Sequence, residues 1–113
     1  MKDRELLVMS AQSVGVELVF NDGFAGYYKD CGGHVAWIPW HPILDGADAM
    51  RLVVHHGMLI NRGIVSCRIE NGARMLQRSF PAGLPGGVKL DRDMQALCRA
   101  IAELAADIAQ VSR

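Results

Sequence analysis

The spacing of apolar residues predicts a helix close to each end of the chain. Over residues 94–108 apolar side chains recur every three or four positions, with charged side chains on the opposite side, which is the period of an amphipathic helix. This stripe consists of Met94, Leu97, Cys98, Ile101, Leu104, Ala105 and Ile108. Asp91 is expected to cap this helix. A weaker stripe of the same spacing, with Asp3 as its cap and Gly15 at its end, predicts a first helix; it consists of Leu6, Leu7, Met9, Ala11 and Val14.

A third helix is predicted directly after a proline-rich stretch near the middle of the chain. Proline fixes its own φ and restricts the residue before it, so Pro39 and Pro42 keep the chain extended and the helix cannot begin before Pro42. Asp45 is then placed to cap the helix, and Asp48 to meet the positive end of its dipole. Two large side chains are expected to clamp this helix start onto the core, those of Trp37 and Trp40.

Alternating apolar positions and turn residues predict two hairpins. Residues 16–20 alternate, Asn21-Asp22-Gly23 is typical of a turn, and residues 24–29 form the returning strand. Residues 34–37 are either a short strand or an extended loop. After the middle helix, residues 64–70 alternate and lead to Asn71-Gly72, a strong signal for a two-residue hairpin turn.

The second hairpin has a defined register if that turn forms. A two-residue turn at Asn71-Gly72 pairs Cys67 with Leu76 and Arg68 with Met75, and residues 73–80 form the returning strand. Residues 81–87, rich in glycine and proline, are expected to be a mobile loop. The element order favours one α+β domain over residues 1–113, with a mostly antiparallel sheet and helices packed on its faces.

The middle stretch also carries a resemblance to a known family. Residues 40–52 read Trp-His-Pro-Ile-Leu-Asp-Gly-Ala-Asp-Ala-Met-Arg-Leu. They resemble the Trp-Asn-Pro-Leu-x-Asp-x-x-Asp-Ala-x-Arg-Leu signature of the phage ABA-sandwich family, small proteins encoded by bacteriophages and prophages. Residues 3–7 and 96–101 resemble the family's terminal helices, whereas His41 replaces the usual Asn and the loop before the last helix is longer. The resemblance implies an α-β-α sandwich with no established activity, in the cytoplasm of a host bacterium.

Charge and composition exclude several classes of function. Lysine plus arginine and aspartate plus glutamate each number 12, so the formal net charge is zero. This balance argues against a general nucleic-acid binder and against electrostatic attachment to membranes, and it favours association with a partner or with a second copy. No apolar run is as long as a membrane span, and three irregularly spaced cysteines fit reduced thiols in a cytoplasm.

Metal binding and nucleophilic catalysis have weak candidates. Cys31, His34 and His41, or the pair His55 and His56, could bind a metal ion, but a structural zinc site needs four ligands from two compact pairs. Adjacent histidines on a helix also diverge by about a hundred degrees. Cys31 lies in a turn near His34 and is the cysteine best placed to react. Two further cysteines fall on apolar faces and are expected to be inert core thiols, Cys67 and Cys98.

His41, Asp45 and Asp48 could instead form an acid–base or metal-dependent hydrolytic group, although capping explains both aspartates without further assumptions. Residues 83–89 lack the lysine followed by serine or threonine that a phosphate-binding loop requires. Four arginines border the second hairpin and could contact phosphates, although such arginines are more often a solvated sheet face: Arg62, Arg68, Arg74 and Arg78.

We therefore predict a non-catalytic interaction module of phage or prophage origin that binds a host or phage protein, or a second copy of itself. We expect no catalytic residue, no metal ion and no cofactor. Two alternatives stay open. One is a small metal-dependent hydrolase or nuclease that uses His41, Asp45 and Asp48, and the other is a nucleic-acid accessory protein that uses the arginine-bordered hairpin.

Overall fold

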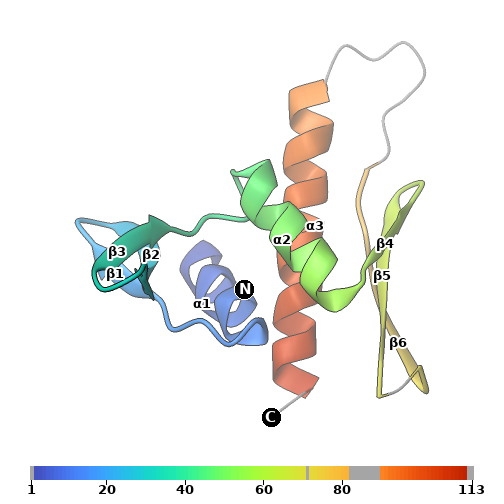
Figure 1. Ribbon diagram of the computed structural model, residues 1–113. Helices are drawn as coiled ribbons and strands as arrows, with labels where there is room; N and C mark the ends of the chain where they lie inside the picture. Colours follow the sequence, from blue (N-terminus) through green and yellow to red (C-terminus); the bar gives the residue numbers. More distant parts are fainter. Residues whose placement is uncertain (1, 71, 82–89, 112–113) are drawn as a thin grey trace.

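A computed structural model describes residues 2–70, 72–81 and 90–111 of the protein, with side chains described from residue 94 onward in the last of these ranges. Within these ranges the chain forms three helices and six strands (Figure 1). The elements are α1 (Asp3–Ser13), β1 (Val19–Asn21), β2 (Phe24–Asp30), β3 (Val35–Pro39), α2 (Gly46–His56), β4 (Leu59–Asn61), β5 (Ile64–Ile69), β6 (Arg74–Ser79) and α3 (Leu90–Val111).

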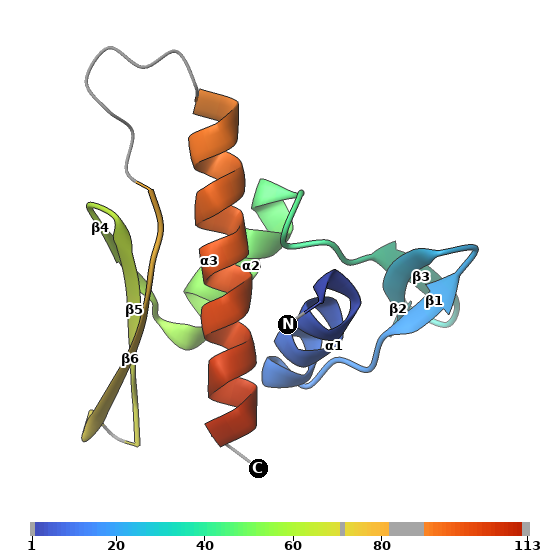
Figure 2. The ribbon, with the colours of Figure 1, turned by 180° about the vertical axis from the view of Figure 1, so that it is seen from behind.

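The strands form two antiparallel sheets, in the orders β1-β2-β3 and β4-β5-β6. Helix α3 lies between them: α1 and α2 pack on one side of it, and β5 and β6 pack on the other (Figures 1 and 2). The predicted α+β class, with antiparallel strands and a helix packed against a sheet, is confirmed. The strands form two sheets instead of one, because the described residues show no pairing between the first three strands and the last three. The three-residue strand β4, which the sequence did not reveal, pairs with β5.

Helix α3 is enclosed on nearly all sides over its central turns. Its predicted stripe is confirmed from Cys98 to Ile108, while Met94, at the start of the stripe, is 46% exposed. Six neighbouring side chains are at most 2% exposed: Ala100, Ile101, Ala102, Leu104, Ala105 and Ala106. Alanines on the side away from the stripe are buried because elements pack against both sides of the helix.

Three charged side chains in the described part of α3 form ion pairs with other elements, those of Arg99, Glu103 and Asp107. The Arg78 guanidinium donates to both carboxylate oxygens of Asp107, at 2.7 and 2.8 Å, and joins β6 to α3. Arg99 donates to the Asp3 carboxylate at 2.8 Å. The prediction that Asp3 caps α1 is wrong, because Lys2 occupies the cap position without a side-chain hydrogen bond. Helix α3 begins one residue before Asp91, whose side chain lies outside the described set.

The two hairpins differ in how well the sequence defined them. The register Cys67–Leu76 and Arg68–Met75 is confirmed, and Gly72 has a positive φ of 85°, whereas Asn71 lies outside the described residues. In the first hairpin, β1 begins at Val19 rather than at residue 16. The Val16 N–H donates to the Ala11 carbonyl at the end of α1, so residues 16–18 follow the helix and do not join the sheet.

Of two segments that the sequence left irregular or undecided, the structure describes one. Residues 35–39 form strand β3, which settles the alternative between strand and loop. The predicted mobile loop over residues 81–87 lies outside the described residues except for Pro81. Among the helices that the structure describes, none has the length and apolar character needed to cross a membrane.

Candidate functional site

The start of helix α2 brings together the three residues that the sequence singled out. Asp45 is the N-cap, and its Oδ1 accepts a hydrogen bond from the Ala47 N–H at 2.9 Å, as predicted. The Asp48 Oδ2 accepts from the His41 N–H at 2.9 Å. Both carboxylates therefore bind backbone N–H groups that the proline-rich stretch and the helix start would otherwise leave unpaired.

Asp48 is the more unusual of the two aspartates because it is buried, with an exposed fraction of 5%. Burial raises the pKa of its carboxyl, while the hydrogen bond from the His41 N–H opposes that shift. Arg51 lies 3.9 Å from the second carboxylate oxygen. The His41 Nδ1 atom is buried and has no hydrogen-bond partner among the described residues. The arrangement fastens the extended stretch to the helix start.

Metal binding finds little support in the described ranges. Within residues 2–70, 72–81 and 90–111, no three His, Cys, Asp or Glu residues come together as ligands would. Cys31 and His34 meet through their backbones, since the Cys31 N–H donates to the His34 carbonyl at 2.7 Å, and the His34 side chain is exposed. Their proposed partner His41 lies in the connection between β3 and α2, beyond the end of β3 that is far from Cys31 and His34.

The adjacent histidines at the end of α2 are engaged in packing. Their rings meet edge to face, with centroids 4.8 Å apart. The His56 Nε2 atom lies 2.9 Å from the Ser13 hydroxyl oxygen, which joins the end of α2 to the end of α1. Burial, and then the neighbouring His55, lowers the pKa of His56 to about 4. His56 is therefore a neutral, structural histidine at physiological pH.

The remaining candidates are dispersed. Cys67 and Cys98 are buried as predicted, and burial raises the pKa of both thiols. The four arginines do not form one cluster. Arg78 is paired with Asp107. The Arg68 side chain lies on the opposite face of the same hairpin and donates to the Gly72 carbonyl. The glycine-rich residues 83–89 lie outside the described part.

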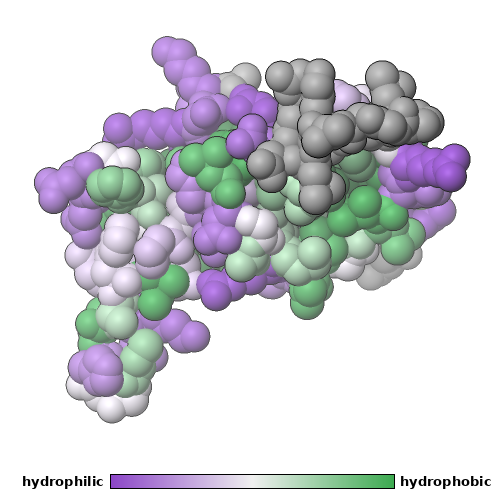
Figure 3. Space-filling view, turned by 90° about the horizontal axis from the view of Figure 1, so that it is seen from above, coloured by the Kyte–Doolittle hydropathy of each residue, from purple (hydrophilic) through white to green (hydrophobic). Residues whose placement is uncertain are grey.

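A feature that the sequence did not reveal is the placement of the β1–β3 sheet. This sheet stands away from α3, and its side of the molecule extends into a narrow projection with hydrophobic and hydrophilic residues mixed on it (Figures 1 and 3). Aromatic contacts hold its inner face to the helices. The Arg4 guanidinium lies 4.2 Å above the Phe20 ring, and Tyr27 meets Trp40 edge to face at 6.3 Å. Trp40 is 2% exposed and confirms one half of the predicted clamp. The prediction is wrong for Trp37, because the register places its side chain on the other face of the sheet, where its ring lies against Gly26.

The outer face of the β1–β3 sheet carries apolar and aromatic side chains. The register places Tyr28 opposite Trp37, with Gly26 beside this pair. The exposed fractions are 69% for Phe24, 55% for Tyr28 and 66% for Val35. We call the outward side chains of Phe24, Tyr28, Val35 and Trp37 the outer face. Large apolar side chains exposed on one face, with polar residues such as Asn21 and Asp30 beside them, are typical of an interaction surface.

The sequence held a partial signal for the outer face. Phe24, Gly26 and Tyr28 alternate with inward residues, which indicates two aromatic side chains on one side of a strand. The third strand was undecided from the sequence, so Val35 and Trp37 could not be assigned to the same side.

Comparison with known proteins found no match: no family model, no curated protein and no solved structure is similar to this chain. The resemblance of residues 40–52 to the phage ABA-sandwich signature therefore stays a prediction.

Proposed function

We propose that this chain is a non-catalytic interaction module of phage or prophage origin, which binds a host or phage protein in the host cytoplasm through the outer face. The observation that carries the proposal is the exposure of Phe24, Tyr28 and Val35 on the same face of a projecting sheet, where they are spread along β2 from Phe24 to the end of the strand at Asp30. The resemblance of residues 40–52 supports the phage origin.

The energetics of such a surface support a binding role. Burying a large apolar side chain contributes about 1.5–3 kcal/mol, so two or three anchors on one face supply much of a stable complex. The sheet is also held from behind, because Arg4 packs on Phe20 and Tyr27 packs on Trp40. A surface that is rigid before binding loses less conformational entropy in the complex.

The other functions considered receive less support. In a hydrolase, Asp45 and Asp48 would bind a metal ion or a substrate, whereas here they accept hydrogen bonds from backbone N–H groups. A nucleic-acid accessory protein would present its arginines together, whereas Arg78 is paired with Asp107 and Arg68 lies on the other side of the hairpin.

The test replaces apolar side chains of the outer face and leaves unchanged the contacts that hold the sheet to the rest of the protein, Arg4 on Phe20 and Tyr27 on Trp40. A variant with Phe24→Ser and Val35→Ser is used as bait, beside the parent, in a bacterial lysate, with chemical crosslinking and identification of the captured proteins. We expect at least a tenfold loss of the proteins that the parent captures. The matched control is Val54→Ser, a 76% exposed apolar residue on α2. Equal capture by the parent and the double variant, or no specific capture by the parent, would contradict the proposal.

A further inference from the structure

Strand β2 has an edge that β1 leaves uncovered. The pairing of β1 with β2 runs from Asn21–Phe24 to Val19–Gly26 and stops there, whereas β2 continues to Asp30. On its other side, β2 pairs with β3 along residues 26–30. The second half of β2 therefore has a partner on one side only within the described part of the chain.

The backbone groups that face this uncovered edge can be assigned. The Trp40 N–H donates to the Ala25 carbonyl and the Cys31 N–H donates to the His34 carbonyl, so the odd-numbered residues of β2 face β3. Backbone groups alternate between the two sides of a strand. The N–H and C=O groups of Tyr28 and Asp30 therefore point toward the side where β1 has ended.

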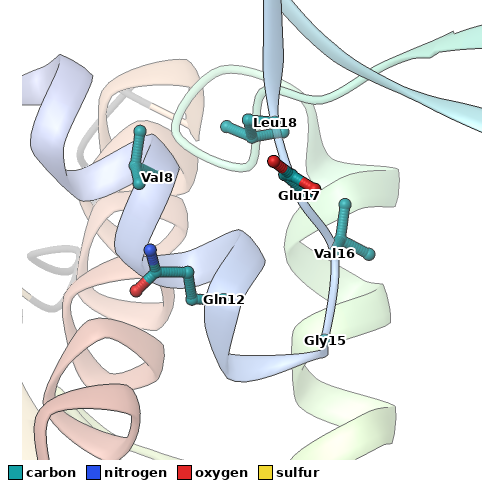
Figure 4. A pocket seen from close by; sticks show the side chains of 6 residues that line it. All are labelled: Val8, Gln12, Gly15, Val16, Glu17 and Leu18. Carbon is teal, nitrogen blue, oxygen red and sulfur yellow. The ribbon is translucent and has the colours of Figure 1, made fainter.

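A groove lies beside this edge, because residues 16–18 diverge from β2 to follow α1. It has a volume of about 280 Å³ and is lined by Gly15, Val16, Glu17, Val19, Tyr27 and Tyr28. A second groove, of about 400 Å³, lies on the α1 side of the same segment (Figure 4). It is lined by Val8, Gln12, Gly15, Val16, Glu17 and Leu18. The diverging segment thus has an open groove on each side.

Glu17 is the charged residue among those that line the two grooves, and it is negative, while Arg51 donates to the Tyr27 hydroxyl at 3.3 Å. Glu17 lines both grooves, its side chain is exposed, and no ion pair to it occurs among the described residues. Asp30 lies at the end of the uncovered edge, where its carboxylate accepts from the Gly33 N–H at 3.3 Å. Lys29, between Tyr28 and Asp30 in sequence, belongs to the opposite face of the strand. A cationic side chain complements this edge.

We propose that the uncovered edge of β2 at Tyr28 and Asp30 accepts an extended segment of the partner protein, which continues the line of β1 and places a Lys or Arg beside Glu17. This inference rests on the proposed function, since it specifies the part of the partner that binds. The edge is continuous with the outer face, because Tyr28 contributes its side chain to the outer face and its backbone to the edge. Added strands of this kind bind through backbone hydrogen bonds, with pockets for alternate side chains.

The test uses the full chain and a pool of acetylated hexapeptides in which Thr alternates with Val, Ile, Leu, Lys, Arg or Glu. We expect the bound members to carry Lys or Arg at one alternate position and to bind at least tenfold more weakly to Glu17→Gln. The matched control is Glu5→Gln, an exposed glutamate on α1. N-methylation of the peptide amides that face β2 should abolish binding, and N-methylation of the intervening amides should not.

Amide hydrogen exchange, followed by NMR, locates the added strand. Bound hexapeptide should slow exchange at Tyr28 and Asp30, but not at Phe20, whose N–H faces the opposite, free edge of β1. The inference is overturned if no hexapeptide binds at millimolar concentration, if Glu serves as well as Lys, or if protection appears at another edge. Self-association through β2 in light scattering would also overturn it, because the occupant would then be a second copy.

The two proposals can fail separately. If capture from the lysate depends on Phe24 and Val35 but persists in Glu17→Gln, the proposed function stands and the added strand does not. If the hexapeptides bind at the edge of β2 and the lysate yields no specific protein, the proposed function fails while the edge keeps its affinity for a basic strand.

Discussion

Gly26 and Trp37 show at the scale of single residues how the outer face is built. Gly26 has no side chain, and the Trp37 indole occupies the space above it. A Cβ atom at Gly26 would meet two ring carbons of Trp37 and would lie 2.6 Å from the Ile38 carbonyl oxygen. Glycine within a strand often marks such a close approach.

We expect Gly26→Ala to destabilise the protein by about 1–3 kcal/mol, because Trp37 or the β3 backbone must move to admit the methyl group. Urea unfolding followed by tryptophan fluorescence measures the loss. The matched control is Gly46→Ala in the first turn of α2, where an added Cβ meets no atom within 4 Å. The control should be as stable as the parent or slightly more stable. Equal unfolding midpoints for both variants would show that the indole does not rest on Gly26.

Residue-scale chemistry was only partly readable from the sequence. The Asp45 cap follows from a local pattern, because the acceptor and the N–H that it binds are two residues apart. The Asp48–His41 hydrogen bond spans seven residues and depends on how the chain bends after Pro42. Asp3 shows that a suitable capping residue need not cap. It lies one position after the N-cap Lys2, inside the helix, and its carboxylate binds Arg99. Local patterns identify which residues can cap, and tertiary contacts decide which ones do.

Helix α3 is the element on which the rest of the fold packs. Ile101 is 2% exposed at its centre, between α1 and α2 on one side and β5 and β6 on the other. Replacing Ile101 with Ala should cost about 2–5 kcal/mol, because the cavity left in a core enclosed from both sides cannot collapse easily.

Met94 is the matched control for this prediction, because it belongs to the same stripe of α3 but is 46% exposed. We expect Met94→Ala to cost less than about 1 kcal/mol, as is usual for partly exposed sites away from a packed core. Chemical denaturation of both variants gives the comparison. Similar losses at the two positions would mean that burial at Ile101 is not what stabilises the helix.

At the scale of elements, periodicity predicted the helices well and the sheets incompletely. A period of 3.6 residues over fifteen positions distinguishes a helix clearly, and the Asn71-Gly72 signal fixed a register that the structure confirms. Strand β4 has three residues, too few for an alternation to be recognised. The uncovered edge of β2 could not be foreseen, because it depends on residues 16–18 following α1, where the Val16 N–H donates to the Ala11 carbonyl, instead of extending β1.

The stability of the whole molecule should depend on pH through His56, because this side chain joins the end of α2 to the end of α1. The Ser13 hydroxyl donates to the Ser10 carbonyl at 2.6 Å, so its oxygen is left to accept the N–H from His56 Nε2. The pKa of His56 falls from 6.5 to about 4 in the folded protein, chiefly because the ring is buried. The neutral ring therefore belongs to the folded state, and the protonated ring is favoured in the unfolded state.

We expect the folded state to lose stability as the pH falls from about 6.5 to about 4, because the unfolded chain binds a proton at His56 that the folded chain excludes. Above about pH 6.5 the His56 ring is neutral in both the folded and the unfolded chain, so it no longer changes the stability. Thermal melts at pH 7.5, 6, 5 and 4 measure the effect, which His56→Gln should reduce and the exposed control His34→Gln should not.

Asp48 titrates in the opposite sense, because burial raises its pKa and its protonation at low pH relieves the cost of a buried charge. The difference between the parent and His56→Gln, rather than the slope of the parent, therefore isolates the histidine. An identical pH profile for the parent and His56→Gln would contradict the assignment.

The central position of α3 has a consequence for how the chain is made. Synthesis proceeds from the N-terminus at about 5–20 residues per second, and α3 is the last element of the described chain to emerge from the ribosome. Helices α1 and α2 and the β4–β6 sheet are then complete for several seconds before the helix on which they pack exists. During this interval Leu6, Leu52 and Val65 have no core to enter. We therefore expect the nascent chain to expose apolar side chains that chaperones recognise until the last turns of α3 have appeared.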